Sequence, residues 1–387
     1  MLRKADRIAT VPPYLFATID KKRREAQARG VDIINLGIGD PDQPAPAYVV
    51  DRLAKEAAIY HRYPDYEGAP EFRQAAADYY MKRFGVTADP KTEIMALVGS
   101  KEGLSHLVWA FVDPGDVALV PDPAYPVYRT QTLLAGGIPV AMPLLAENNF
   151  LPDLDAIAPE VAEKATIMFL NYPNNPTAAV ADLAFFEKAV AFCKKYNILL
   201  CSDNAYAEMT YDDFVAPSVL QVPGAKDIAI ETYSLSKPYN MTGWRIAWAI
   251  GNAEAVGALG IIKTNTDSGQ FTAIQMAGIE AMERQPKAFV DEMNRMYKGR
   301  RDVLINGLRE LGWDIEPPKG TFYAWIPTPK GYNSAGFAEL MLEKAGIIVT
   351  PGSAYGQHGE GYVRFALTVD EKRMREAVDR IGKALKS

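Results

Sequence analysis

The chain has 387 residues, of which 48% are hydrophobic and 23% are charged, and its formal net charge is −6. This is the composition of a globular protein, and the length favours two domains. The acidic balance argues against nucleic acid as a partner, because binding to phosphates needs a basic face. No signal peptide is visible, and no apolar run reaches the roughly 18 residues of a membrane span. With only two cysteines, Cys193 and Cys201, we expect a cytoplasmic protein without a disulfide framework and without a membrane partner.

Seven short apolar runs, rich in β-branched residues, follow one another through the middle of the chain. They are residues 94–98, 117–121, 138–143, 166–171, 197–202, 227–233 and 245–251. Amphipathic helical patterns separate several of them, for example 101–112 and 181–197. Strands that are apolar throughout and alternate with helices predict an α/β fold, with a mostly parallel sheet between layers of helices.

The pattern changes after residue 285. A long charged helical stretch, 286–312, leads to a short β-rich region around TFYAWIP and IIVTPGS, and the chain closes with a helix. This order predicts a second, smaller α+β domain. We expect a large domain of residues 46–285 and a small domain of residues 1–45 and 286–387.

Two glycine-rich motifs and the histidines favour no site of their own. GIGDPD (37–42) lacks the third glycine of a dinucleotide-binding loop, and GSAYG (352–356) has Ala354 where a nucleophile elbow needs serine. His61, His106 and His358 have no metal-ligand spacing, and His106 fits a packed side chain within a helix. We therefore expect no metal.

Polar residues follow several of the predicted strands. GSKEG (99–103) joins a strand to a helix, which suits an anion at the helix N-terminus or a plain turn with Ser100 as N-cap. Lys237 follows another strand, close to Ser234, Ser236 and Arg245, whose hydroxyls and guanidinium suit a phosphate. Lys237 is thus either a solvated loop residue or a nucleophile.

Three further candidates, Asp203, Tyr206 and Asn175, follow two other strands. Because the carboxyl ends of parallel strands meet in one crevice, all these side chains share one edge of the sheet. A lysine, a carboxylate and a phosphate cradle together favour pyridoxal phosphate, with the lysine as Schiff base and the carboxylate on the pyridine nitrogen.

Longer motifs resemble a known family. SLSK…MTGWR, NNPT and SDNAY are similar to fold-type I pyridoxal-phosphate enzymes, the class I/II aminotransferases, and the resemblance covers nearly the whole chain. PPYLFATID, GSKEG, PDPAYPVY, LNYPNNPTAA and NTDSGQF most resemble the LL-diaminopimelate aminotransferase group. Ala178, Pro238 and Ala247 depart from the wider family, which usually has glycine at the first and the last of these positions.

The resemblance implies a role for each matching residue. Lys237, Asp203 and Tyr206 are the implied catalytic residues. The implied cofactor-binding residues are Lys237, Ser100, Lys101, Tyr125, Asn175, Asp203, Tyr206, Ser234, Ser236 and Arg245, with Tyr63 from a partner subunit. The implied substrate-binding residues are Gly39, Asn175, Arg364 and Tyr14.

The resemblance also implies an activity and an assembly. We expect a homodimer with shared active sites that moves an amino group between an L-amino acid, for example LL-2,6-diaminopimelate, and 2-oxoglutarate by a ping-pong mechanism. Two alternatives remain open. A carbon–sulfur β-lyase or another lyase of this fold would use the same motifs, and a non-catalytic regulator would share the fold but carry a DNA-binding extension.

Overall fold

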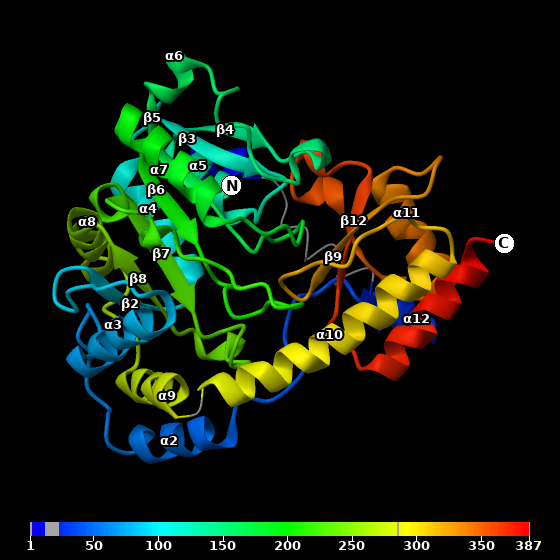
Figure 1. The fold of residues 1–387 in the computed structure, drawn as a ribbon, viewed down its shortest axis with the longest axis horizontal. Helices are drawn as coiled ribbons and strands as arrows, with labels where there is room; N and C mark the ends of the chain where they lie inside the picture. The colour runs from blue at the N-terminus through cyan, green and yellow to red at the C-terminus, as the bar shows by residue number, and fades with distance from the viewer. Residues whose placement is uncertain (1, 12–22, 285, 387) are drawn as a thin grey trace.

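The computed structural model describes residues 2–11, 23–284 and 286–386. Its central feature is a seven-stranded sheet with the strand order β2-β8-β7-β6-β5-β3-β4 (Figure 1). The strands are β2 (Ile94–Leu97), β3 (Val117–Asp122), β4 (Ile138–Pro143), β5 (Ala165–Leu170), β6 (Leu199–Asp203), β7 (Ala229–Ser234) and β8 (Ala247–Gly251). All seven predicted strands are confirmed, and their ends differ from the prediction by no more than two residues.

One strand runs against the others. β8 is antiparallel to both of its neighbours, β7 and β2, whereas every other pair in this sheet is parallel. The pairing of β7 with β8 ends where Ser234 lies opposite Ala247. The chain between these two residues therefore leaves and re-enters the sheet at the same edge.

Helices cover both faces of this sheet, as predicted. Alternate residues of the strands pack in opposite directions, so that Phe169 and Leu97 join one apolar core and Met168 and Ala96 join another. The first core includes α4 (Ser100–Phe111), α5 (Val127–Ala135) and α8 (Ala253–Thr264). The second includes α2 (Ala47–Ala57), α3 (Pro70–Phe84), α7 (Leu183–Tyr196) and α9 (Thr272–Glu283). A strand buried on both faces needs apolar residues at every position, which explains the continuous apolar runs.

Local signals set the ends of these helices. The side chain of Asp182 accepts a hydrogen bond from the backbone N–H of Phe185 and so caps α7. The same helix ends at Asn197, which adopts a left-handed conformation with φ 55°. Gly85 ends α3 in the same way, with φ 69°.

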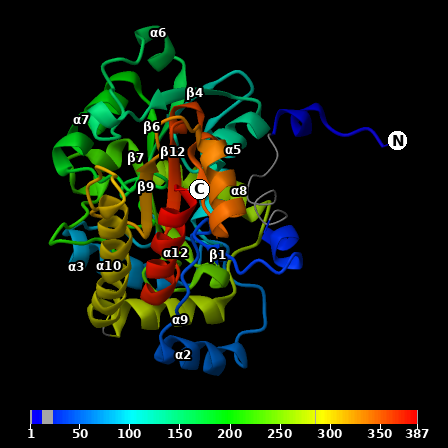
Figure 2. The ribbon, with the colours of Figure 1, turned by 90° about the vertical axis from the view of Figure 1, so that its right-hand side faces the viewer.

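The second part of the molecule lies beyond α10 (Pro286–Glu310), which Figure 1 shows as a long helix leading away from the large sheet. A three-stranded antiparallel sheet has the order β11-β12-β9, from β9 (Tyr323–Pro327), β11 (Thr350–Pro351) and β12 (Tyr362–Ala366). Figure 2 shows α10 beside α12 (Glu371–Ala384), with α11 (Ser334–Leu340) farther across.

The N-terminal segment contacts this second part, since β1 (Ile34–Asn35) pairs in parallel with β10 (Ile347–Ile348). The exact domain boundaries at residues 45/46 and 285/286 stay a prediction. Within the described residues, no helix is both long and apolar enough to cross a membrane.

Candidate active site

A cavity of about 400 Å³ lies between the carboxyl ends of β5, β6 and β7 on one side and β9, β12 and residues 38–40 on the other. Most of the predicted site residues line this cavity. They are Gly39, Ser100, Lys101, Tyr125, Asn175, Asp203, Tyr206, Ser234, Ser236, Lys237, Arg245 and Arg364. Tyr63 does not line it and is 94% exposed, and Tyr14 lies outside the described residues.

Lys237 lies in the connection between β7 and β8. Its Nζ donates a hydrogen bond to the carbonyl oxygen of Gly39 at 3.1 Å and lies 5.2 Å from the centre of the Phe322 ring. Burial lowers the pKa of Lys237, and the opposing effects of Tyr323 and Asp40 are smaller. The surroundings thus favour the neutral amine, which is the nucleophilic form.

Asp203 ends β6 and is buried. Tyr128 donates a hydrogen bond to one carboxylate oxygen at 2.8 Å, and Thr232 donates to the other at 3.3 Å. Burial raises the pKa of Asp203 to about 6, although these hydrogen bonds oppose the rise. At neutral pH the group is therefore still mostly a carboxylate, and a buried carboxylate attracts a positively charged partner.

The turn before α4 forms an anion cradle. Gly99, and not Ser100, is the N-cap of α4, so the simple capping role considered for Ser100 is wrong. The Oγ of Ser100 is buried and has no hydrogen-bond partner among the described residues. Gly99 has φ 76°, and a Cβ there would lie 2.0 Å from Nη2 of Arg245. Glycine therefore lets the guanidinium approach the positive end of a helix beside an unsatisfied hydroxyl, which suits a phosphate.

Arg364 closes the opposite side of the cavity. It is 2% exposed, and its guanidinium donates to Oδ1 of Asn175 and to the carbonyl oxygen of Gly37, both at 2.8 Å. The ring of Tyr323 stacks under it, with the ring centre 4.0 Å from Cζ. These contacts hold a planar, charged donor in one orientation toward the cavity, as recognition of a carboxylate requires.

Sequence reasoning missed several residues of the cavity, among them Tyr323, Asp40 and Thr242. The hydroxyl of Tyr323 lies 3.2 Å from that of Tyr206, and a Cβ on Gly39 would lie 1.9 Å from it. For Tyr323, the sequence offers only the β-rich TFYAWIP segment, which predicts a strand and no site residue. Tyr128, which donates a hydrogen bond to Asp203, lies within the PDPAYPVY segment, one of the motifs that resemble the family.

The departure at Ala178 has a structural cost. Its φ is 58°, in the left-handed region that glycine adopts without strain. The backbone N–H of Ala178 donates a hydrogen bond to the carbonyl oxygen of Asn174 at 2.9 Å, directly before Asn175. No comparable geometric reason accounts for Pro238.

The fold and the site together define a class of protein. A mostly parallel sheet presents a buried lysine, a buried carboxylate and an anion cradle at one edge, which is the layout of a fold-type I pyridoxal-phosphate enzyme. The chain belongs to the aminotransferase class I and II family, because the model of that family matches residues 31–381. It is an enzyme, a pyridoxal-phosphate-dependent aminotransferase, and its substrates are small amino acids and oxo acids.

Individual relatives agree with this assignment. An LL-diaminopimelate aminotransferase from Moorella thermoacetica is 55% identical over 99% of this chain and 99% of its own length. The apo-BacF structure from Bacillus subtilis is 40% identical, with a TM-score of 0.95 over 99% of this chain and 98% of that chain. A double mutant of Thermus thermophilus aspartate aminotransferase is 30% identical, with a TM-score of 0.93 over 99% of this chain and 100% of that chain. The predicted fold class, family and cofactor are confirmed, and nothing favours the lyase alternative.

Proposed function

We propose that this aminotransferase exchanges an amino group between LL-2,6-diaminopimelate and 2-oxoglutarate. The choice of amino acid is supported by the names of its curated relatives, which are 51–55% identical to it over nearly their whole length. The reaction class is supported by one observation above all. Lys237 and Arg364 lie on opposite walls of the same cavity, so that an α-carboxylate on the arginine places the α-carbon toward the lysine.

We propose the following roles for the residues of the cavity. Ser100, Lys101, Ser234, Ser236 and Arg245 bind the cofactor phosphate, with Tyr63 of the second subunit added to them. Tyr125 stacks on the cofactor ring, and Tyr206 and Asn175 donate hydrogen bonds to its phenolic oxygen. Arg364 and Gly39 bind the substrate.

The cofactor supplies a carbonyl carbon for the amino group and a ring that accepts the electrons left at the substrate α-carbon. The chain does the rest. Asp203 keeps a proton at the ring nitrogen, because a buried carboxylate favours a cation beside it. The Nζ of Lys237 removes the α-proton of the substrate, which requires the neutral amine that burial favours. The guanidinium of Arg364 orients the substrate so that this proton faces Nζ.

A substrate panel tests the choice of amino acid. The purified holoenzyme is given 2-oxoglutarate with LL-2,6-diaminopimelate, L-aspartate, L-alanine or L-phenylalanine, and the glutamate formed is measured. We expect kcat/KM for LL-2,6-diaminopimelate to exceed the others by about tenfold or more, with parallel lines in double-reciprocal plots. Preference for another amino acid contradicts the choice of substrate. Release of pyruvate and ammonia from cystathionine without an oxo acid would support the lyase alternative instead.

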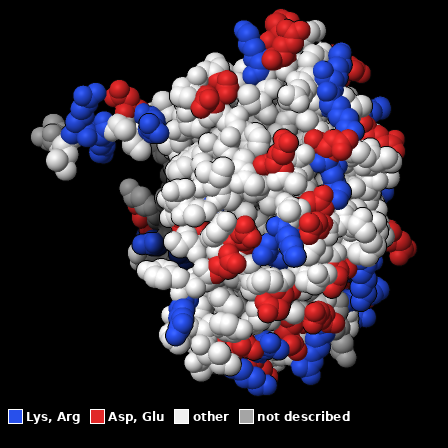
Figure 3. Space-filling view, turned by 90° about the vertical axis from the view of Figure 1, so that its left-hand side faces the viewer, with Lys and Arg blue, Asp and Glu red and all other residues white. Residues whose placement is uncertain are grey.

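We further propose that the enzyme is a cytoplasmic homodimer with shared sites. Tyr63 at 94% exposure and Ile261 of α8 at 68% are large apolar side chains on the surface. Figure 3 shows, on the side of the molecule that carries α8, a broad area with few charged side chains. Such a surface favours a self-complementary contact. Cys193 and Cys201 are buried free thiols, which suits a reducing compartment.

Subunit mixing tests the shared site. Tyr63→Phe subunits are combined with Lys237→Ala subunits, so that a mixed dimer has one site with both native groups. We expect the mixture to regain part of the wild-type activity. If the mixture shows only the activity of its Tyr63→Phe component, Tyr63 does not act across an interface.

A further inference from the structure

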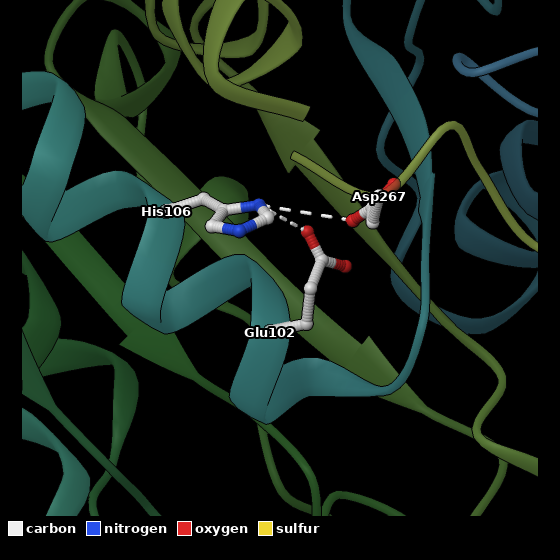
Figure 4. A group of neighbouring side chains, drawn as sticks. All are labelled: Glu102, His106 and Asp267. Atoms are coloured by element: carbon white, nitrogen blue, oxygen red, sulfur yellow. Dashed lines mark ion pairs between the residues drawn. The ribbon is translucent and has the colours of Figure 1, made fainter. Parts of the chain in front are cut away.

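A cluster of buried and partly buried titratable groups lies next to the anion cradle. Figure 4 shows the imidazole of His106 facing the carboxylates of Glu102 and Asp267, the first on α4 and the second in the loop after α8. Nδ1 of His106 lies 2.6 Å from Oε1 of Glu102 and 3.9 Å from Oδ2 of Asp267. The donor atoms of the three residues all lie within 4.8 Å of one another, a spacing that a metal ion could use.

The cation of this cluster is a lysine. Lys263 of α8 is 0% exposed, and its Nζ lies 3.4 Å from Glu102 and 3.0 Å from Asp267. A buried ammonium needs such partners, because burial without them costs several kcal/mol. Its charge also offsets one of the two negative charges of these carboxylates. We therefore interpret the cluster as an ion-pair network and not as a metal centre.

Both carboxylates hold segments that reach the cradle. Glu102 accepts a hydrogen bond from the backbone N–H of Val98, two residues before Ser100, at 2.8 Å. Asp267 accepts one from the backbone N–H of Gly269 at 2.8 Å, and so shapes the turn that leads to Gln270.

Gln270 carries the link to the other half of the cradle. Its side-chain amide donates to the carbonyl oxygen of Trp244 at 3.1 Å and to that of Arg245. Arg245 has φ 56°, a left-handed conformation that needs support from its surroundings in a residue with a large side chain. Through Glu102 and Asp267, the ammonium of Lys263 thus links the backbone segment before Ser100 to the loop that contacts the backbone of Arg245.

We propose that Lys263 is a positioning residue for the anion cradle. Its ammonium holds Glu102 and Asp267 together, and thereby keeps the Ser100 turn and the Gln270 loop at the separation that the cofactor phosphate requires. Without the ammonium, the two partly buried carboxylates would repel each other and move the two segments apart. This inference rests on the proposed use of Ser100 and Arg245 for the phosphate.

The test measures affinity for the cofactor and for inorganic phosphate, not turnover. The cofactor is removed from wild type and from Lys263→Met, and each is titrated with pyridoxal 5′-phosphate and, in competition, with inorganic phosphate. We expect Lys263→Met to weaken both affinities by about tenfold, the size expected within one charge network. Lys263→Arg, which keeps the positive charge, should lie closer to wild type than Lys263→Met does.

Lys226→Met is the matched control. Nζ of Lys226 lies 2.7 Å from Glu93. Lys226 precedes the first residue of β7, at the end of the strand away from the cavity, and neither residue of this ion pair lines the cavity. We expect this variant to change the melting temperature without changing either affinity. If Lys263→Met also lowers only the melting temperature and leaves both affinities as in wild type, the inference is wrong.

A second variant guards against a Lys263→Met protein that does not fold. Asp267→Asn keeps the pair between Lys263 and Glu102, and should weaken phosphate binding several-fold. Unchanged affinities in this variant overturn the inference as well. Failure of wild type itself to bind pyridoxal 5′-phosphate or phosphate would instead contradict the proposed function of Ser100 and Arg245.

Discussion

Different contacts hold the two walls of the cavity in place. The seven-stranded sheet provides one wall, called the sheet wall here, and residues 37–42 with the three-stranded sheet provide the opposite wall. On the sheet wall, Asp203 ends a strand and Lys237 follows one within three residues, so local structure places them. On the opposite wall, contacts between distant parts of the chain place the backbone. Arg364 donates to the carbonyl of Gly37, and Arg300 forms two hydrogen bonds with Asp42 at 2.7 and 2.8 Å.

The two walls of the cavity carry different functional groups. The sheet wall holds the two groups with shifted pKa values, Lys237 and Asp203, at or just after the ends of buried strands. The opposite wall holds the guanidinium of Arg364 and the backbone around Gly39, which touch the sheet wall through only a few polar contacts. Chemistry should therefore depend on the first wall, and substrate recognition on the second.

The largest effect should come from the sheet wall. Lys237→Ala removes the amine that we propose moves the α-proton, and we expect transamination to fall by about 10⁴-fold. Glutamate formation measures the loss. Borohydride reduction of the wild-type holoenzyme, followed by peptide mapping, should find the cofactor on Lys237. A label on any other lysine contradicts the assignment.

The next largest effect should come from a substitution on the opposite wall. Arg364→Lys keeps the charge but loses the planar donor that reaches Asn175 and Gly37 together. We expect kcat/KM for the amino acid to fall about 100-fold, while the affinity for the cofactor changes little. A primary amine without an α-carboxylate serves as the control substrate. An equal loss with that amine would show that Arg364 does not act through the carboxylate.

A third experiment tests the raised pKa of Asp203 through the pH dependence of protein stability, independently of catalysis. Burial raises the pKa of Asp203 in the folded protein to about 6, above the ordinary 3.8 of an aspartate, so its favourable contribution to folding is complete below pH 3.8 and is lost as the pH rises through 6. Asn cannot titrate. Cofactor-free Asp203→Asn should therefore gain stability over wild type between pH 4 and pH 7, by up to about 3 kcal/mol.

Denaturant unfolding at pH 4.5 and pH 7.5 measures this difference. Asp155→Asn, at an exposed position, is the matched control and should show no such pH dependence. A constant difference between Asp203→Asn and wild type at both pH values would contradict the raised pKa.

The smallest effect concerns the contact between the two walls. The hydroxyl of Thr242 donates to Asp40 at 2.7 Å, and its carbonyl accepts from Arg245 at 2.9 Å. Thr242→Val removes the first contact and keeps the second, so we expect KM for the amino acid to rise about fivefold with no change in cofactor affinity. Thr242→Ser retains the hydroxyl and should resemble wild type. A defect in Thr242→Ser together with wild-type behaviour of Thr242→Val would mean that the methyl group, and not the hydrogen bond, matters.

The same difference between the walls explains how much the sequence could predict. The seven strands were predictable because buried parallel strands are apolar at every position, and Lys237, Asp203 and Ser100 were found because each follows such a strand. Tyr323 was missed because no motif near it marks the cavity, and Asp40 was missed although its neighbour Gly39 was predicted to bind the substrate. Their positions come from contacts between segments about 200 to 300 residues apart.

The cluster around Lys263 shows the same limit. Glu102 and His106 are four residues apart on one helix, but Lys263 and Asp267 reach them only through the packing of α8 against α4. No spacing along the chain predicts that meeting. Likewise, a glycine-like φ at Ala178 is a property of the folded loop and not of the residue.

The reversed direction of β8 has a consequence for how this enzyme can diversify. A parallel neighbour would need a crossover that carries the chain back to the opposite edge of the sheet. Because β8 is antiparallel, residues 235–246 form one short connection, fixed at its base by Ser234 and Ala247, and this connection carries both Lys237 and Arg245. The number of residues between Lys237 and Arg245 helps to fix how far apart these two groups lie, and our proposal requires that distance to match the size of the cofactor. Changes on the opposite wall leave this spacing unaltered. We therefore expect that substitutions there can change the preference for the amino acid without changing the part of the cavity proposed for the cofactor.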